Sequence, residues 1–346
     1  MLFGAMDHLD ISDHCPIAEH YENRLKLLEL YDAFGFYGFH TTEHHCTPLG
    51  GGASPSVFLA AAAQRTKTLR LGTLVYVLPA YHPIRLVEEI GMLDQMSNGR
   101  LDLGFGRGSV PMELAYLGID PGDARAIYEE ALQCIIQGLR DQRIDFHGKY
   151  FDIKNAPIFQ RPLQRPLPPI WYGVHSVESA EKAAERGFNI VCNEPSEDSA
   201  VYIARFKEVW KRVRPGEPTA KIGLARFVVV GATDHDAAVV ANRAYSVFFK
   251  SFRFLHTRHG VVPRLSGRES TYSELEASGR GVAGAPDRVV RILGEQLTQA
   301  GADYCIMRMA FGDMRFAEMS ESVALFAKQV APALREQSDR QIFETA

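Results

Sequence analysis

Short apolar runs alternate with longer amphipathic stretches along most of the chain. Residues 2–6 form the first apolar run, and residues 19–34 follow with apolar side chains at close to the helical period. Gly35 then fits the end of that helix. The recurring apolar runs predict eight strands, at residues 2–6, 37–41, 69–78, 101–105, 169–173, 188–192, 222–230 and 304–309. The stretches between and after them predict helices at residues 19–34, 55–66, 83–96, 122–139, 176–187, 196–213, 234–249, 286–300 and 316–334.

This alternation predicts an α/β fold, a (β/α)8 TIM barrel. Strands separated by helices pair in parallel through right-handed crossovers, and eight of them favour a closed barrel over an open sheet. A chain of 346 residues would fit two average domains, but no linker divides it. We therefore expect one barrel domain over residues 1–346.

Two segments add length to the expected barrel. Residues 144–169 form an insertion that begins as a hairpin or loop and ends in a stretch with five prolines. That stretch could be a ligand for a proline-binding module, but a rigid connection into the next strand is the better interpretation. Residues 256–283 are rich in glycine and charge, so we expect a long mobile loop, either a lid or a passive surface excursion.

Composition excludes several classes of protein. The net charge of −4 is small and mixed in sign, so we expect no nucleic-acid partner. No apolar run approaches the roughly 18 residues of a membrane span, and the start meets an acid at Asp7 without a basic region, so neither a membrane anchor nor a signal peptide is expected. Five scattered cysteines without a CxxC pair indicate a reduced, cytoplasmic setting.

In a barrel, chemistry lies where strands end and the following loops begin. Glu43, His44 and His45 follow the second strand. One histidine could act as a general base, since imidazole titrates near neutrality. A metal site joined by His8 and His82, as in a hydrolase, and a structural role are the alternatives; neighbouring strand residues point to opposite sides, which disfavours the metal.

Two further strand ends carry groups suited to anions. Gly106 and Arg107 follow the fourth strand, where glycine allows close approach and arginine can bind a phosphate or carboxylate. Ser176 follows the fifth strand and begins a helix whose amino-terminal end can take a phosphate, although ordinary capping would explain it too. Because the two strands are neighbours, these signals can converge. Asp7, Tyr81 and Glu113 are rim residues to which we assign structural roles.

These features together resemble the bacterial luciferase-like, flavin-dependent monooxygenases over nearly the whole chain, most weakly in residues 195–283. The stretch from Leu93 to Gly108 is the most specific part of the likeness. The resembling motifs are Thr42-Glu43-His44-His45, Leu71-Gly72-Thr73 through Leu78-Pro79, His82-Pro83 with Arg85, Leu93-Asp94-Gln95-Met96-Ser97 with Gly99-Arg100, Gly104 to Gly108, and Val282-Ala283-Gly284-Ala285-Pro286 with alanine in the hydroxyl position.

The resemblance implies a barrel that binds reduced FMN and activates O2 through a flavin peroxide to oxidise a small organic substrate. It implies that His44 is the catalytic histidine and that no metal takes part. Residues that match cofactor positions are Glu43, Leu74 and Val75 (where the family has a non-proline cis peptide), Gly106, Arg107, Arg125, Gly173, Val174, His175, Ser176 and Ser179.

Some positions depart from luciferase itself. Gly106 stands where luciferase has a cysteine near the flavin, His175 stands where it has a glutamate, and Cys192-Asn193 replaces a pair that ends in tryptophan. These changes alter the walls around the flavin and the substrate. They put light emission and the use of long-chain aldehydes in question.

The resemblance to flavin-dependent monooxygenases also indicates the partners of this chain. We predict a separate NAD(P)H:flavin reductase and a homodimer or heterodimer through the second and third helices, where Ala60-Ala61-Ala62-Ala63 offers a small-residue face. Two other readings remain open: a deazaflavin-dependent hydride-transfer enzyme of the same superfamily, and a non-catalytic flavin-binding subunit.

Overall fold

The computed structural model describes residues 1–261 and 269–345, with side chains described as far as Arg340. Eight parallel strands close into a barrel, because β10 pairs with both β9 and β12. Around the ring the order is β12, β1, β2, β3, β5, β8, β9 and β10. These strands are β1 (Leu2–Asp7), β2 (Gly38–Thr41), β3 (Arg70–Thr73), β5 (Leu101–Gly106), β8 (Ile170–Val174), β9 (Asn189–Cys192), β10 (Ile222–Val230) and β12 (Tyr304–Arg308). All eight predicted strands are therefore barrel strands.

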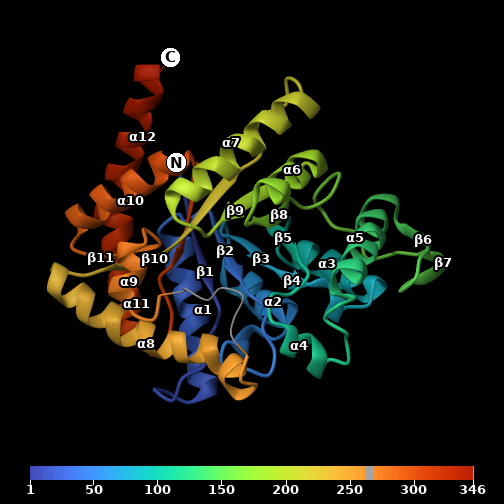
Figure 1. Cartoon of the computed structure of the whole chain (residues 1–346), viewed down its shortest axis with the longest axis horizontal. Coiled ribbons are helices and arrows are strands. Elements are labelled where there is room, and N and C mark those ends of the chain that lie inside the picture. Colours follow the sequence, from blue (N-terminus) through green and yellow to red (C-terminus); the bar gives the residue numbers. More distant parts are fainter. Residues whose placement is uncertain (262–268, 346) are drawn as a thin grey trace.

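Helices surround the barrel (Figure 1). They are α1 (Ile17–Ala33), α2 (Pro55–Arg65), α3 (Pro83–Met96), α4 (Pro111–Tyr116), α5 (Ala124–Asp141), α6 (Val177–Arg186), α7 (Ser196–Val213), α8 (Asp234–Arg258), α9 (Tyr272–Ala277), α10 (Pro286–Ala300), α11 (Phe316–Leu325) and α12 (Ala331–Thr345). Proline opens α2, α3 and α10, at the first-turn position where its missing N–H costs nothing. Among the described residues, no helix is long and apolar enough to cross a membrane.

The barrel interior is filled by side chains from alternate strand positions. Met6, Leu74, Trp171, Val191, Ala225, Tyr304 and Ile306 form this inner apolar cluster. Two members of this cluster also make polar contacts. The Trp171 indole donates to Asp102 at 3.0 Å, and the Tyr304 hydroxyl lies 3.2 Å from Nε2 of His40. Burial lowers the pKa of His40 to about 4, so its ring is neutral at physiological pH. Side chains thus fill the interior of the barrel, so a binding or catalytic site is expected at its carboxyl-terminal end.

Several boundaries differ from the sequence prediction. The expected strand 69–78 is broken into β3, a cis peptide bond between Leu74 and Val75, and the short strand β4 (Tyr76–Val77). The insertion begins as an antiparallel hairpin, β6 (Arg143–His147) with β7 (Asp152–Pro157), which projects beyond α5 at the edge of the molecule (Figure 1).

The predicted long loop at residues 256–283 is wrong over residues 256–258, 272–277 and 281–283, which lie in helices or a strand. Helix α8 continues to Arg258, α9 follows, and β11 (Gly281–Gly284) pairs with the end of β10. Buried Ser251, Leu255 and His256 continue the inner face of α8, and their partly polar character hides the helical period in the sequence. Residues 262–268, the middle of the expected loop, lie outside the described residues.

Candidate active site

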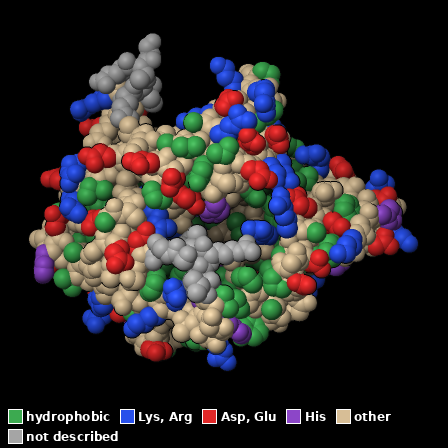
Figure 2. Space-filling view, viewed as in Figure 1, with side chains coloured by type: hydrophobic (Ala, Val, Ile, Leu, Met, Phe, Trp, Pro, Cys, Tyr) green, Lys and Arg blue, Asp and Glu red, His purple; other side chains and the backbone are tan. Residues whose placement is uncertain are grey.

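The inner layer at the carboxyl-terminal end of the barrel follows from strand alternation. Ala225 and Ile306 point into the barrel, so Phe227 and Arg308, two positions further along the same strands, lie one layer higher on the same side. By the same argument His8 lies above Met6, and Gly173 lies above Trp171. Figure 2 shows a hollow near the middle of this face, bordered by basic side chains.

His44 follows β2 and pairs with a carboxylate from another element. Its Nδ1 lies 3.0 Å from Oε1 of Glu113, on the short helix α4. An ionised carboxylate only accepts, so Nδ1 carries a hydrogen and Nε2 is left to take or give a proton. The ring of His8 stacks on His44 with centroids 5.7 Å apart. The structural role predicted for Glu113 is therefore incomplete, because Glu113 orients the candidate catalytic histidine.

His45 points to the other side of the chain. Its Nε2 lies 2.8 Å from Oε1 of Glu43, and the hydrogen bond to that carboxylate raises the pKa of His45. The other oxygen of Glu43 accepts from the Val77 N–H and the Tyr81 hydroxyl, both at 3.0 Å. The structure thus places Glu43 behind the carboxyl-terminal opening of the barrel, called the mouth below. There its hydrogen bond to the Val77 N–H holds β4 in place next to Val75.

The metal-dependent hydrolase hypothesis needs four histidines close together, and the structure does not bring them together. His45 is held by Glu43, and His82 packs edge-on against Phe151, away from His8 and His44. In the part of the chain that the structure describes, no group of three or more His, Cys, Asp or Glu side chains could hold a metal ion.

The cis peptide bond Leu74–Val75 matches the geometry that the family resemblance implied for this position. It lies at the end of β3, beside Gly106 on β5. A Cβ at Gly106 would lie 2.4 Å from Cγ2 of Val75, so only glycine fits this close approach. At Gly173 the nearest described atom to an added Cβ is Nε2 of His175, at 3.4 Å, so this position is less crowded than Gly106.

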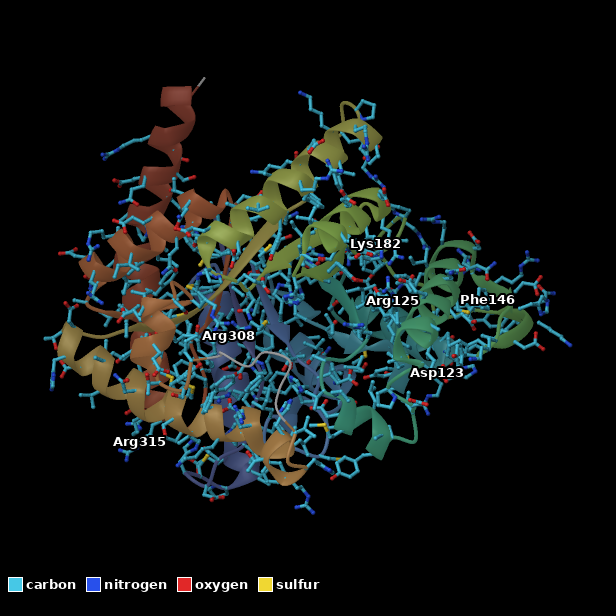
Figure 3. The ribbon with its side chains drawn as sticks, in the orientation of Figure 1. Asp123, Arg125, Phe146, Lys182, Arg308 and Arg315 are labelled. Carbon is cyan, nitrogen blue, oxygen red and sulfur yellow. The ribbon has the colours of Figure 1, made fainter. Side chains whose placement is uncertain are left out.

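Basic groups and hydroxyls gather around the first turn of α6. Ser176 and Ser179 form a reciprocal capping box there, as expected for a helix start. Nη2 of Arg125, on α5, lies 3.8 Å from Oε1 of Glu178 in the same turn, and Lys182 binds that carboxylate too. Figure 3 shows Arg125 and Lys182 close together on the α5–α6 side of the molecule.

Arg107 follows β5, the barrel neighbour of β8, which leads into α6. Its side chain is exposed and makes no ion pair with any described residue. The structure therefore puts Arg107, Arg125 and the start of α6 in one sector of the barrel mouth. Val174 is buried beneath this sector.

His175 forms a second histidine–carboxylate pair at the mouth. Its Nδ1 lies 2.6 Å from Oε1 of Glu194, which follows β9. Burial alone would raise the pKa of Glu194, but the hydrogen bond from His175 and its charge lower it. The pair fixes the ring of His175 with Nε2 over Gly173.

Helix α8 covers the opposite sector of the mouth. The Thr47 hydroxyl donates to the Ser251 carbonyl at 3.2 Å, and Tyr116 on α4 lies 2.8 Å from His259 just past the end of α8. The inner face of α8 brings Phe248 against His8 and Phe227, each with ring centroids 5.2 Å apart. The mouth thus has a basic, hydroxyl-rich side and an aromatic side.

Sequence reasoning missed Glu194, Phe227, Phe248 and Arg308, and it named Asn193 only as a departure from luciferase. The one local signal was the alternation Tyr304, Ile306, Arg308, which puts a cation on the inner side of the last strand. The others become visible only through tertiary contacts.

A family model described as luciferase-like monooxygenase matches residues 2–310. The uncharacterized protein y4wF of Sinorhizobium fredii is 39% identical over 319 residues, covering 91% of this chain and 92% of that protein. The oxygenase component of flavin-dependent trigonelline monooxygenase from Acinetobacter baylyi is 28% identical over 281 residues, covering 78% and 77%.

Solved structures share the fold. Monooxygenase RslO1 from Streptomyces bottropensis superposes with a TM-score of 0.85 at 26% identity, covering 96% of this chain and 99% of that chain. The FMN complex of the oxygenating constituent of 3,6-diketocamphane monooxygenase from Pseudomonas putida has a TM-score of 0.78 at 20% identity, with 96% and 98% covered. Coenzyme F420-dependent tetrahydromethanopterin reductase from Methanopyrus kandleri has a TM-score of 0.73 at 19% identity, with 96% and 99% covered. The last two likenesses show the fold alone.

Proposed function

The chain belongs to the luciferase-like monooxygenase family, and we propose that it is the oxygenase component of a two-component system that uses reduced FMN and O2. The observation that carries this proposal is one arrangement at the barrel mouth. A sector suited to a phosphate, from Arg107, Arg125 and the start of α6, shares the mouth with the His44–Glu113 pair.

The residues present fit the phosphate of FMN. Arg107 and Arg125 supply guanidinium groups that match phosphate geometry, and both side chains are exposed enough to be reached. Ser176 and Ser179 supply hydroxyls, and the amino-terminal end of α6 adds the favourable helix dipole. Glu178 opposes this role, because its carboxylate would repel an anion, and Lys182 offsets it at 2.6 Å.

The residues present also fit a flat aromatic ring. The cis peptide Leu74–Val75 and Gly106 form one wall near the end of β3 and β5, with apolar side chains and no Cβ at residue 106. Gly173 leaves room on the neighbouring strand, where an added Cβ would make only a van der Waals contact, with Nε2 of His175 at 3.4 Å. We propose that the isoalloxazine lies between these groups, with Glu43 supporting β4 from behind.

The chain then orients the cofactor, keeps water out and handles protons. Reduced FMN, when bound, supplies the electrons with which O2 is activated. Glu113 holds Nδ1–H of His44, so Nε2 is the atom at which His44 gives or takes a proton. Helix α8 covers the aromatic side of the mouth, and its inner face, with Phe248 against His8, limits the access of water there.

The reductase is proposed from a relative. The Acinetobacter baylyi protein is named as an oxygenase component, which implies a separate component that reduces its flavin. We therefore propose a separate NAD(P)H:flavin reductase as the partner of this chain. The five free cysteines of this chain support a cytoplasmic setting, and we propose that residues 1–346 form one domain.

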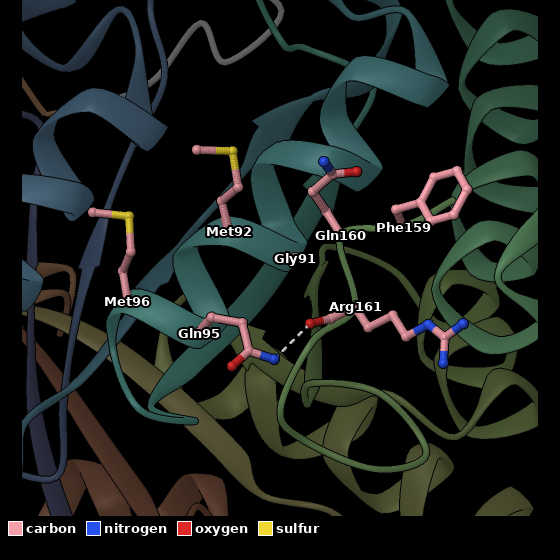
Figure 4. Close-up of a pocket in the computed structure, with 7 residues that line it drawn as sticks. All are labelled: Gly91, Met92, Gln95, Met96, Phe159, Gln160 and Arg161. Atoms are coloured by element: carbon pink, nitrogen blue, oxygen red, sulfur yellow. Dashed lines mark hydrogen bonds between the residues drawn. The ribbon is translucent and has the colours of Figure 1, made fainter. Parts of the chain in front are cut away.

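Self-association through α2 and α3 is also proposed. Val57 and Met92, on the outer faces of these helices, are 71% and 54% exposed, and the nearby Phe159 is 79% exposed. Met92 and Phe159 line a surface hollow of about 390 Å³. Figure 4 shows Met92 on α3 and Phe159 on the neighbouring segment. Exposed apolar side chains of this kind suit contact with a second copy of the chain. Met92→Glu should shift the mass in solution from dimer to monomer; a wild-type monomer at micromolar concentration would refute the proposal.

Cofactor titration tests the proposed function. We expect reduced FMN to bind more tightly than riboflavin, because the phosphate sector contributes, and more tightly than the deazaflavin F420. Tighter binding of F420 than of FMN would instead favour hydride transfer. Absence of saturable binding of either cofactor would refute the proposal.

A further inference from the structure

Arg308 is a cation in the barrel mouth that the phosphate sector does not use. It ends β12, and its cross-strand neighbour in the register with β10 is Phe227. In the closed ring of eight strands, β12 lies four strands from β5, which leads to Arg107, and is therefore on the opposite side of the barrel. Figure 3 shows Arg308 toward the centre of the molecule, well separated from Arg125.

The guanidinium of Arg308 is held in a defined position. Its Nη1 donates to Oδ1 of Asn193 at 3.0 Å, so the side chain reaches from β12 across β10 to the end of β9. On the way it lies over the ring of Phe227, 4.9 Å from the ring centroid. Arg308 is only 7% exposed, so its guanidinium is held within the protein. A cation so oriented inside the mouth offers a fixed, directional donor.

Aromatic rings connect Arg308 to the candidate catalytic histidine. Phe248 of α8 contacts Phe227 on one side and His8 on the other. His8 in turn stacks on His44 at 5.7 Å. A molecule that spans this sector meets a positive charge at one end, rings along its length and the imidazole of His44 at the other end.

We propose that this sector is the substrate-specificity site and that it takes a small planar carboxylic acid, with the carboxylate on Arg308. Arginine binds a carboxylate through two parallel N–H donors, and rings prefer stacked or edge-on aromatic neighbours. The inference rests on the proposed function, since it assigns the substrate class of the same site. Arg308 is then a specificity-determining residue, and Asn193 is a positioning residue that acts through it.

Calorimetric titration of the FMN-loaded protein with benzoate and with benzamide tests the proposal, because these probes differ in charge but hardly in shape. We expect benzoate to bind roughly tenfold to a hundredfold more tightly than benzamide, the range for hydrogen bonds to charged groups. Arg308→Gln should abolish this preference, and Arg308→Lys should keep part of it and guard against misfolding of the first variant. Arg212→Gln, at an exposed position on α7, is the matched control and should change nothing.

Three outcomes would overturn the proposal: no benzoate binding, equal binding of benzoate and benzamide, or full benzoate affinity in both Arg308 variants. FMN affinity serves as an independent readout, since its phosphate sector lies across the barrel and should be unaffected by Arg308→Gln. If wild-type protein fails to bind FMN, the proposed function fails, and the same titration of the unloaded protein still decides the role of Arg308.

Discussion

Nδ1 of His44 lies 3.0 Å from Oε1 of Glu113, although 69 positions separate the two residues in the chain. His44 comes from the end of β2, whereas Glu113 is carried by α4, a single short helix after β5. The pairing fixes which ring nitrogen faces the mouth. Helix α4 therefore carries the carboxylate that orients His44, a role that the sequence of α4 alone does not indicate.

Glu113→Gln should impair proton handling by His44. The amide can hold either tautomer of the ring, so Nε2 is no longer set as the reactive atom. We expect the reoxidation of bound reduced FMN by O2 to change by roughly tenfold or more, a modest share of what a positioned acid–base group supplies. Stopped-flow absorbance measures this rate. Glu321→Gln, at an exposed site on α11, is the control, and equal rates in all three proteins would remove Glu113 from the mechanism.

Arg107→Ala should weaken FMN binding by roughly 1.5–3 kcal/mol, about a ten- to hundredfold loss of affinity, because a charged hydrogen bond to phosphate is lost. Riboflavin lacks the phosphate, so its affinity should not change. Arg125→Ala should have a smaller effect, since that side chain is 66% exposed and lies beside Glu178. Fluorescence titration with both flavins measures these affinities. A parallel loss for FMN and riboflavin would show that Arg107 acts on something other than the phosphate.

Two glycines at the mouth should respond differently to alanine. Gly106→Ala forces a methyl within 2.4 Å of Val75, so we expect a lower melting temperature, with an overpacking cost of about 1–3 kcal/mol. Among the described residues, no atom lies closer than 3.4 Å to the methyl of Gly173→Ala, so the fold should keep its stability. The same methyl would enter the proposed flavin site and weaken flavin binding. Thermal unfolding and flavin titration of both variants test this contrast, and full flavin affinity in Gly173→Ala would argue against the ring position.

His45 should make folding stability depend on pH. The hydrogen bond to Glu43 raises its pKa above the ordinary value of 6.5, so the folded state binds the proton more tightly than the unfolded state. This contribution is fully present below about pH 6.5 and is lost as pH rises through the folded-state pKa. Relative to His45→Gln, the wild-type protein should therefore gain stability on going from pH 8.5 to pH 6, by about 1 kcal/mol. Urea unfolding at both pH values measures it. The gain should vanish in a Glu43→Gln background; a gain that survives there must come from another group.

The sequence predicted the barrel well because its signals are local. Each of the eight strands is a short apolar run between amphipathic stretches, and strand ends point to the mouth in any such barrel. The strand β11, with the sequence Gly-Val-Ala-Gly, lacks the β-branched pattern of a strand and forms only through pairing with β10. The continuation of α8 was missed because its buried positions there include Ser251 and His256.

The site was predictable only in part for the same reason. Histidine, arginine and hydroxyl residues at strand ends are visible in the sequence. Ser176 and Ser179 also mark the start of α6 there. Partners such as Glu113, Glu194 and Asn193 have no local signature, because the contacts that give them a role join elements far apart in the chain. The reactive groups can therefore be predicted from the sequence, whereas the groups that orient them require the structure.

Rapid mixing of the protein and reduced FMN with O2 tests the central claim most directly. The reduced flavin is first titrated into the protein without oxygen, and its reoxidation is then followed by absorbance with and without the protein. The account predicts saturable binding at one FMN per chain, reoxidation kinetics distinct from those of free flavin, and a further change in His44→Ala. No saturable binding, with reoxidation at the rate of free reduced FMN, would contradict it.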